Sequence, residues 1–221
     1  MTNTARRYDL LVFDWDGTLI DSAPTIVACI QSACHDLGFP VPDDERASHV
    51  IGLGLHDALA HAVPGLDPGE YGRVVERYRH HFIQRDPHMA LFEGTREMLH
   101  RLRDAGHVLA IATGKSRAGL ARALESTHLA SLFAASRCAD QCASKPAPDM
   151  LRELMHELEV PRERTLMIGD TIHDLQMAAN AGVAAVAVCH GAHPRDRLVE
   201  HRPLVCVTDT KALRAWLSEN A

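Results

Sequence analysis

Two aspartates separated by a single residue, Asp14 and Asp16, directly follow the apolar run Leu10–Phe13 and precede Gly17. Carboxylates at the end of a buried strand add little to a hydrophobic core, but their oxygens are the ligands that Mg²⁺ prefers. In open α/β sheets, ligands bind at the carboxyl ends of the strands. The pattern therefore predicts a site for Mg²⁺ and phosphate, while a simple Asp-Gly turn is the alternative.

Two further polar signals are a hydroxyl at the end of an apolar run and a lysine that follows the polar stretch 139–144. Thr113 precedes Gly114 and a predicted helix start, where a hydroxyl and backbone N–H groups bind phosphate oxygens well. Lys145 is followed by Pro146, whose rigid backbone suits an ammonium group that must stay pointed into a site. Taken singly, the first segment also fits a plain helix cap and the second a surface lysine.

Asp170 and Asp174 close a fourth apolar run, residues 165–169. Their spacing puts two carboxylates on one face of a helix, where they repel each other unless a cation lies beside them. A capping Asp170 with a solvated Asp174 is the alternative. All four segments are predicted at carboxyl ends of strands. Unrelated helix caps would not all be expected at such positions. Together the four segments therefore predict one site.

The elements that position these residues alternate between short β-like runs and helical segments. This order predicts a doubly wound, Rossmann-like parallel sheet covered by helices. The predicted strands are residues 9–14, 108–113, 133–136, 165–169, 184–189 and 204–207. Apolar residues at helical spacing predict helices over residues 95–105, 117–126, 148–158, 172–181 and 211–218.

One long segment, residues 19–89, interrupts this alternation and holds no convincing strand. Helical patterns cover residues 24–37, 56–62 and 69–84, with prolines between them. We therefore predict an α/β core domain formed by residues 1–18 and 90–221. Residues 19–89 are predicted to form a small all-helical domain that is inserted after the first strand and lies over the strand ends.

The composition indicates a globular protein and excludes several partners. The 221 residues are 46% hydrophobic and carry a formal net charge of −6, without a basic stripe for nucleic acid. The six cysteines have no metal-finger spacing, and the 15 histidines are scattered without ligand spacing. No apolar run is long enough to span a membrane, so we expect a cytoplasmic protein with reduced thiols.

In order and spacing, the four polar segments resemble the four-motif signature of the haloacid dehalogenase (HAD) superfamily. The residues that carry this resemblance are Asp14-Trp15-Asp16-Gly17-Thr18, Thr113, Lys145 and Gly169-Asp170 with Asp174. Asp21-Ser22-Ala23-Pro24, the helical insertion and Lys145-Pro146 further resemble the phosphoglycolate phosphatase-like branch, which has a small helical cap. Trp15 stands where the family usually has a smaller apolar residue.

The resemblance implies a Mg²⁺-dependent phosphatase that forms an aspartyl-phosphate. Asp14 would be the nucleophile, and Asp16 would protonate the leaving oxygen and later deprotonate water. Thr113 would hold the phosphoryl oxygens, and Lys145 would help to keep Asp14 ionised. The groups implied as ligands of the Mg²⁺ are the Asp14 carboxylate, the Asp16 backbone carbonyl and Asp170. Asp174 would contact a water molecule bound to the metal, or Lys145.

Other activities of the superfamily fit fewer residues. A dehalogenase usually lacks an acid two residues after its nucleophile, so Asp16 favours phosphoryl transfer. A phosphonatase of this cap type uses a cap lysine, and no lysine precedes Lys115. Similar sugar phosphomutases carry a histidine on the first cap helix, where this chain has Thr25-Ile26-Val27. A mutase, a pyrophosphatase and a non-catalytic binding protein stay open as alternatives.

The substrate is expected to be a small phosphorylated metabolite. The branch implies 2-phosphoglycolate, with other phosphate monoesters as alternatives. The paired glycines of Ile51-Gly52-Leu53-Gly54-Leu55 would let the backbone approach the active site, or would serve as a hinge. Candidates for contact with an anionic leaving group are Arg46, His49, His56 and Arg85. The sequence leaves the oligomeric state open.

Overall fold

The structure is a computed structural model and describes residues 6–86 and 89–221. Residues 1–5 and 87–88 of the predicted domains lie outside the described residues. Six parallel strands form one sheet in the order β3-β2-β1-β4-β5-β6, which confirms the predicted doubly wound α/β fold. The strands are β1 (Leu10–Phe13), β2 (Val108–Thr113), β3 (Ala135–Cys138), β4 (Thr165–Gly169), β5 (Ala184–Val188) and β6 (Cys206–Val207).

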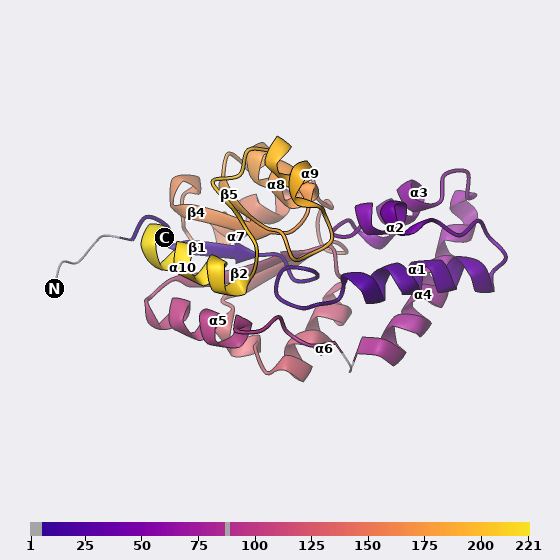
Figure 1. Ribbon diagram of the computed structural model, residues 1–221, viewed down its shortest axis with the longest axis horizontal. Helices are drawn as coiled ribbons and strands as arrows, with labels where there is room; N and C mark the ends of the chain where they lie inside the picture. Colours follow the sequence, from indigo (N-terminus) through magenta and orange to yellow (C-terminus); the bar gives the residue numbers. More distant parts are fainter. Residues whose placement is uncertain (1–5, 87–88) are drawn as a thin grey trace.

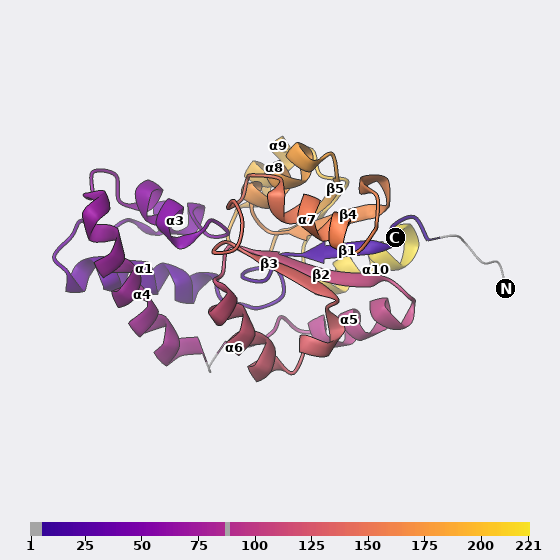
Figure 2. The same cartoon turned by 180° about the vertical axis from the view of Figure 1, so that it is seen from behind.

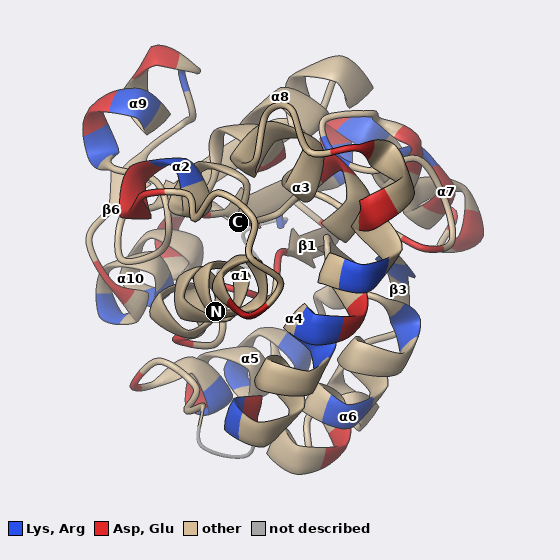
Figure 3. Ribbon diagram, turned by 90° about the vertical axis from the view of Figure 1, so that its right-hand side faces the viewer, with Lys and Arg blue, Asp and Glu red and all other residues tan. Residues whose placement is uncertain are grey.

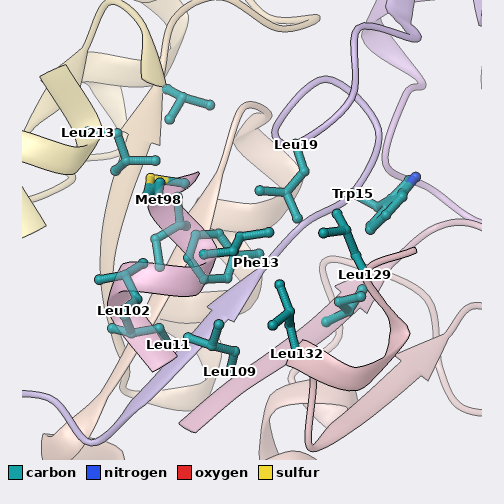
Figure 4. Packing of buried hydrophobic residues seen from close by; sticks show 14 of the residues in the cluster. Leu11, Phe13, Trp15, Leu19, Met98, Leu102, Leu109, Leu129, Leu132 and Leu213 are labelled. Atoms are coloured by element: carbon teal, nitrogen blue, oxygen red, sulfur yellow. The ribbon is translucent and has the colours of Figure 1, made fainter. Parts of the chain in front are cut away.

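Both faces of the sheet are buried, because successive strand residues point to opposite sides and helices cover each side. Leu11 and Phe13 pack with α5 (Thr95–Asp104), α6 (Arg117–Thr127) and α10 (Thr210–Asn220) (Figure 4). Leu10 and Val12 pack on the other side with α7 (Asp149–Glu157) and α8 (Ile172–Ala181). The layers are seen from both sides in Figures 1 and 2. The carboxyl ends of the central strands therefore lie between two packed layers.

Four helices between β1 and α5 build a second, smaller hydrophobic cluster. They are α1 (Ala23–Asp36), α2 (Asp44–His49), α3 (Leu55–Ala62) and α4 (Tyr71–Arg85), with a 3₁₀ turn at Pro68–Glu70. Their cluster includes Cys29, Ile30, Leu59, Val74 and Phe82, all of them buried. Figure 1 shows these helices at one end of the molecule, beyond the carboxyl end of β1.

The chain leaves and re-enters the core through two linkers that lie side by side. Ile20 and Leu91 form an antiparallel bridge. The Asp21 N–H donates to the Ala90 carbonyl at 2.9 Å, and the Phe92 N–H donates to the Leu19 carbonyl at 3.1 Å. The two crossing points are therefore tied to each other next to the loop that carries Asp14 and Asp16.

Three histidines connect the end of α2 to the core. The His173 Nε2 lies 2.7 Å and the His193 Nε2 3.1 Å from the His49 carbonyl oxygen. The His193 Nδ1 accepts the Ile172 N–H at 3.0 Å, so its Nε2 carries the ring hydrogen and donates. Burial lowers the pKa of His193 to about 4. A neutral imidazole thus holds the insertion to the core.

Two short helices were not predicted from the sequence. Helix α2 buries Ala47 alone and begins at a cap in which Asp43 accepts the Arg46 N–H at 2.8 Å. Helix α9 (Arg195–Glu200) buries Leu198 alone. A helix with one buried side chain has no repeat of apolar residues at helical spacing, so that repeat cannot predict it. Strand β6 is also shorter, with two residues instead of the four predicted.

The distribution of charged residues and the state of the cysteines are as the sequence predicts. In Figure 3 both acidic and basic residues lie on α4, α6 and α9. The six cysteines are free. None of the helices within residues 6–86 and 89–221 has the length and apolar character needed to cross a membrane.

Candidate active site

Asp14 lies at the carboxyl end of β1 in the middle of the sheet. Its N–H donates to the Ile168 carbonyl at 2.9 Å, which continues the ladder between β1 and β4. The side chain is fully buried, and the Lys145 Nζ lies 2.8 Å from its Oδ1. Lys145 is 1% exposed and also lies 2.6 Å from Asp174 Oδ1, so one buried ammonium pairs with two carboxylates. These acids raise the pKa of Lys145 despite its burial, and it stays charged.

Asp170 is fixed by groups from two other loops. Its Oδ1 accepts the Thr18 hydroxyl at 2.7 Å, and its Oδ2 accepts the Ala192 N–H at 2.7 Å. A Cβ at Gly17 would stand 2.2 Å from Asp170 Oδ2, and a Cβ at Gly191 would stand 2.1 Å from it. Glycine is therefore required at both positions for the backbone to reach this carboxylate.

Asp174 takes part in the cap of α8. Thr171 is the N-cap residue, and Asp174 Oδ2 accepts both the Thr171 N–H at 3.0 Å and the Thr171 hydroxyl at 2.7 Å. The prediction that Asp170 and Asp174 share a helix face was wrong, because the helix begins at Ile172 and Asp170 precedes its cap. The two carboxylates still meet, because the capping box turns Asp174 back toward the strand end.

Asp14, Asp170 and Asp174 form a buried acidic cluster that suits a divalent cation. One oxygen of each lies within 4.8 Å of the others. Neither Asp14 oxygen receives a hydrogen bond of good geometry, although Lys145 is close. Burial raises the pKa of Asp14 well above its usual range, while Lys145 opposes the change. One ammonium cannot balance three carboxylates, so the donor set fits a hard cation such as Mg²⁺.

Asp16 faces a different environment, although it is only two residues from Asp14. The Lys115 Nζ donates to both of its carboxylate oxygens, at 2.9 and 3.0 Å. The Ser22 hydroxyl donates to Asp16 Oδ1 at 2.8 Å. The Asp16 side chain is thus outside the acidic cluster and faces the insertion. No role was predicted for Lys115 or Ser22, although both are adjacent to predicted motif residues in the sequence.

Thr113 is fully buried at the end of β2, and its hydroxyl accepts the Lys115 N–H at 3.1 Å. This bond shapes the turn that carries Lys115 toward Asp16. The Lys115 Nζ also lies 4.5 Å from the centre of the Phe82 ring, which belongs to α4. Lys115 therefore contacts both the predicted acid and base and the wall of the insertion.

A cavity of about 270 Å³ lies between the strand ends and the insertion. Asp14, Asp16 and Thr113 line it from the core, and the turn 51–55 lines it from the insertion. The Gly54 N–H donates to the Ser144 hydroxyl at 2.7 Å. A Cβ at Gly114 would stand 2.5 Å from the Gly52 carbonyl oxygen. The paired glycines thus bring the backbone of the insertion against the core at the active site.

The four candidates for an anionic leaving group are not placed together. His56 lines the cavity. Arg46 and His49 line a separate groove beside α9. Arg85 donates to the Cys29 sulfur at 3.4 Å and to the His81 carbonyl at 3.5 Å. Arg46, His49 and Arg85 were proposed from charge alone, and charge gives no direction of a side chain.

Gly191→Ala is expected to weaken Mg²⁺ binding by about tenfold or more, because the added methyl group displaces the Asp170 carboxylate. Titration of the protein with Mg²⁺ by calorimetry measures the dissociation constant. Gly72→Ala is the matched control: no atom lies within 4 Å of its added Cβ, and it should stabilise α4 by about 0.5–1 kcal/mol. An unchanged Mg²⁺ affinity in Gly191→Ala would contradict the placement of Asp170.

Mg²⁺ is expected to raise the melting temperature more at about pH 8 than at about pH 5.5. Burial and the Asp174 charge raise the pKa of Asp170 to about 7. Without the cation, the neutral Asp170 carboxyl group stabilises the folded protein fully at pH values below its unfolded pKa of about 3.8. This stabilisation is lost as the pH rises through the folded pKa of about 7. A hundredfold excess of Mg²⁺ over its dissociation constant adds about 2.7 kcal/mol, or about 5–10 °C.

Thermal unfolding with Mg²⁺ or with EDTA at the two pH values measures this difference. Asp170→Asn is the control and should show no response to Mg²⁺. Equal shifts at both pH values would contradict the linkage between the cation and these carboxylates.

The geometry of the site agrees with comparisons to known proteins. The sequence model of the haloacid dehalogenase-like hydrolases matches residues 11–188, most of the chain. The chain belongs to the haloacid dehalogenase-like hydrolases. This HAD membership confirms the predicted superfamily.

Several curated relatives of this HAD protein are named as phosphatases. "Probable phosphatase IndB" of Dickeya dadantii is 36% identical and covers 90% of this chain and 88% of its own. A 5'-nucleotidase of Pseudomonas aeruginosa is 30% identical over the full length of both chains. A phosphoglycolate phosphatase of Aliivibrio fischeri is 30% identical over 95% of this chain and 96% of its own. The predicted enzyme class, an HAD-like phosphatase, is confirmed.

Solved structures show the same HAD fold. A hydrolase from Pseudomonas syringae matches with a TM-score of 0.88 at 22% identity, over 96% of this chain and 98% of that chain. A haloacid dehalogenase-like family hydrolase from Streptococcus pneumoniae matches with a TM-score of 0.81 at 21% identity, over 95% of this chain and 98% of that chain. At this identity the likeness concerns the fold.

Proposed function

We propose that this HAD-like phosphatase is Mg²⁺-dependent and hydrolyses a small phosphate monoester through an aspartyl-phosphate on Asp14. The observation that carries the proposal is the contrast between two aspartates two residues apart. Asp14 is buried beside Lys145 and two carboxylates, and Asp16 faces the cavity with Lys115 and Ser22. Such different surroundings suit two carboxyl groups with different tasks.

In the first step, an Asp14 oxygen forms a bond to phosphorus while the bond from phosphorus to the leaving oxygen breaks. Asp16 in its protonated form transfers its proton to that leaving oxygen, so that an alcohol departs, and the Lys115 ammonium lies beside the carboxylate that forms. Lys145 lowers the pKa of Asp14 against the effect of burial and so favours the ionised form that attacks. Thr113 and nearby backbone N–H groups hold phosphoryl oxygens, on which charge is spread in the transition state.

In the second step, Asp16 takes a proton from a water molecule. The water oxygen forms a bond to phosphorus, and the bond from phosphorus to Asp14 breaks. Inorganic phosphate leaves, and both carboxyl groups return to their starting forms. One difficult displacement is thereby divided into two easier ones.

The Asp14 carboxylate, the Asp16 backbone carbonyl and Asp170 would hold the Mg²⁺. When bound, Mg²⁺ supplies positive charge that offsets the negative charge of the phosphoryl group. Asp174 acts through Lys145, which lies 2.6 Å away. In this proposal residues 19–89 are the cap domain over a core domain of residues 1–18 and 90–221, and the cap limits access of bulk water.

Hydrolysis of p-nitrophenyl phosphate and of a panel of phosphorylated metabolites, each with Mg²⁺ and with EDTA, tests the proposal. The panel includes 2-phosphoglycolate, for which one relative is named, and 5'-nucleotides, for which another is named. We expect turnover with Mg²⁺ and its loss with EDTA. Absence of phosphate release from every ester in the presence of Mg²⁺ would contradict the proposal.

A further inference from the structure

We propose that the cavity under the cap takes a leaving group with a planar aromatic ring, rather than the small carboxylic acid of 2-phosphoglycolate. This inference rests on the phosphatase function proposed above and names the class of its substrate. A benzyl-type ester and a nucleoside 5'-phosphate share this chemistry. Three features of the cavity support it: its apolar wall, its pair of aromatic rings and the state of its cationic side chains.

The wall that the cap contributes is mainly apolar. Ile26, Ile30 and Val50 are buried residues of the cap cluster that line the cavity opposite Asp14. Ile83, which also lines it, is 52% exposed, one of the large apolar side chains left open to solvent. The volume of about 270 Å³ approaches the lower end of the range for pockets that enclose drug-sized ligands, about 300–1,000 Å³. A phosphate with a two-carbon acid would leave this apolar surface in contact with water.

Two aromatic rings of α4 stand in the same wall. Tyr78 and Phe82 stack with ring centres 5.6 Å apart and planes 26° from parallel. The Lys115 ammonium lies over Phe82 at 4.5 Å and fixes that ring. Tyr78 is half-buried, and its hydroxyl has no hydrogen bond to any residue that the structure describes. It therefore offers both a ring for stacking and a free polar group.

The cationic side chains of the cavity do not form a pocket for a carboxylate. Lys115 is paired with Asp16, and Arg122 lies 3.7 Å from Asp86. Arg79 and His56 line the cavity, and both are exposed. A carboxylate on the leaving group would therefore meet no free buried cation among the described residues that line the cavity. Such a charge is costly to desolvate.

The test compares four esters: benzyl phosphate, thymidine 5'-monophosphate, 2-phosphoglycolate and ethyl phosphate. All four release a primary alcohol, so their intrinsic reactivities are similar. We expect kcat/KM for at least one aromatic ester to exceed that for ethyl phosphate and 2-phosphoglycolate by about tenfold to a hundredfold. A preference for benzyl phosphate alone assigns a simple aryl group, and a preference for the nucleotide assigns a nucleoside.

Variants of the wall separate binding of the ring from the chemistry. Tyr78→Ala should lower kcat/KM for the preferred aromatic ester by about tenfold, mainly through KM, and leave ethyl phosphate nearly unchanged. Tyr78→Phe should retain the preference. Ile83→Ser should raise KM for the aromatic ester alone. Val41→Ser is its matched control, because Val41 is 49% exposed and does not line the cavity.

Preferred hydrolysis of 2-phosphoglycolate, above all if Arg79→Gln removes it selectively, would overturn this inference and leave the phosphatase function intact. Equal losses for aromatic and ethyl esters in Tyr78→Ala would also overturn it. Absence of turnover of all four esters with Mg²⁺ would overturn the proposed function, and this inference with it. Asp14→Asn serves as the blank that excludes a contaminating phosphatase.

Discussion

Asp14→Asn is expected to abolish turnover of every phosphate ester, with kcat lowered by about 10⁴-fold or more. An amide is a poor nucleophile, and Asp174, the other carboxylate beside Lys145, is held in the cap of α8 by two hydrogen bonds from Thr171. The variant should fold, because it removes one negative charge from a buried cluster in which Asp170 and Asp174 repel it. Steady-state kinetics and thermal unfolding measure the two effects.

Asp196→Asn is the control for this variant. Asp196 is exposed on α9, outside the cavity, so the same chemical change should leave kcat unaltered. Retention of more than a few percent of kcat in Asp14→Asn would contradict the role of Asp14 as nucleophile. Loss of activity together with a lower melting temperature would show that the carboxylate acts through the fold instead.

Asp16→Asn is expected to uncouple the two steps. The p-nitrophenolate group leaves without a proton, so Asp14 should still be phosphorylated by p-nitrophenyl phosphate. Removal of the phosphoryl group needs a base for water, so the steady rate should fall by about 10²–10⁴-fold. Stopped-flow absorbance should then show a burst of about one equivalent of p-nitrophenol per active site, followed by slow release.

The same variant should give no burst with ethyl phosphate, because an alkoxide needs a proton to leave. This difference between the two esters separates proton transfer from a general disturbance of the site. Lys115→Met provides a comparison, because it removes the ammonium at 2.9 Å that orients Asp16 but leaves the carboxyl group in place. If the steady-state rate of Asp16→Asn falls equally for both esters and no burst appears, the role of Asp16 as general acid and base is contradicted.

The sheet and the convergence of its strand ends followed from the sequence for a simple reason. Parallel strands place all their carboxyl ends at one edge, so polar residues that end separate apolar runs must meet there. Asp14, Thr113 and Asp170 could therefore be brought together without coordinates. Fully buried strands read as continuous apolar runs, which made β1, β2, β4 and β5 easy to find.

The partners of these residues could not be found in the same way. The direction of the long Lys115 side chain depends on the turn that Thr113 shapes, and spacing alone does not fix that turn. Gly191 and Ala192 hold Asp170 by close approach and by a backbone N–H, and neither residue has a polar side chain that would mark it. The turn 51–55 was predicted to approach the site, but the part of the cavity wall on α1 and α4 was missed because ordinary apolar residues form it.

The most direct test of the proposed mechanism is a search for the phosphoryl group on the protein. The Asp16→Asn variant is mixed with p-nitrophenyl phosphate and Mg²⁺, quenched in acid within the burst, digested and examined by mass spectrometry. We predict one phosphoryl group, located on Asp14 and absent from Asp14→Asn. Rapid release of p-nitrophenol without any phosphorylated Asp14 would contradict the aspartyl-phosphate mechanism.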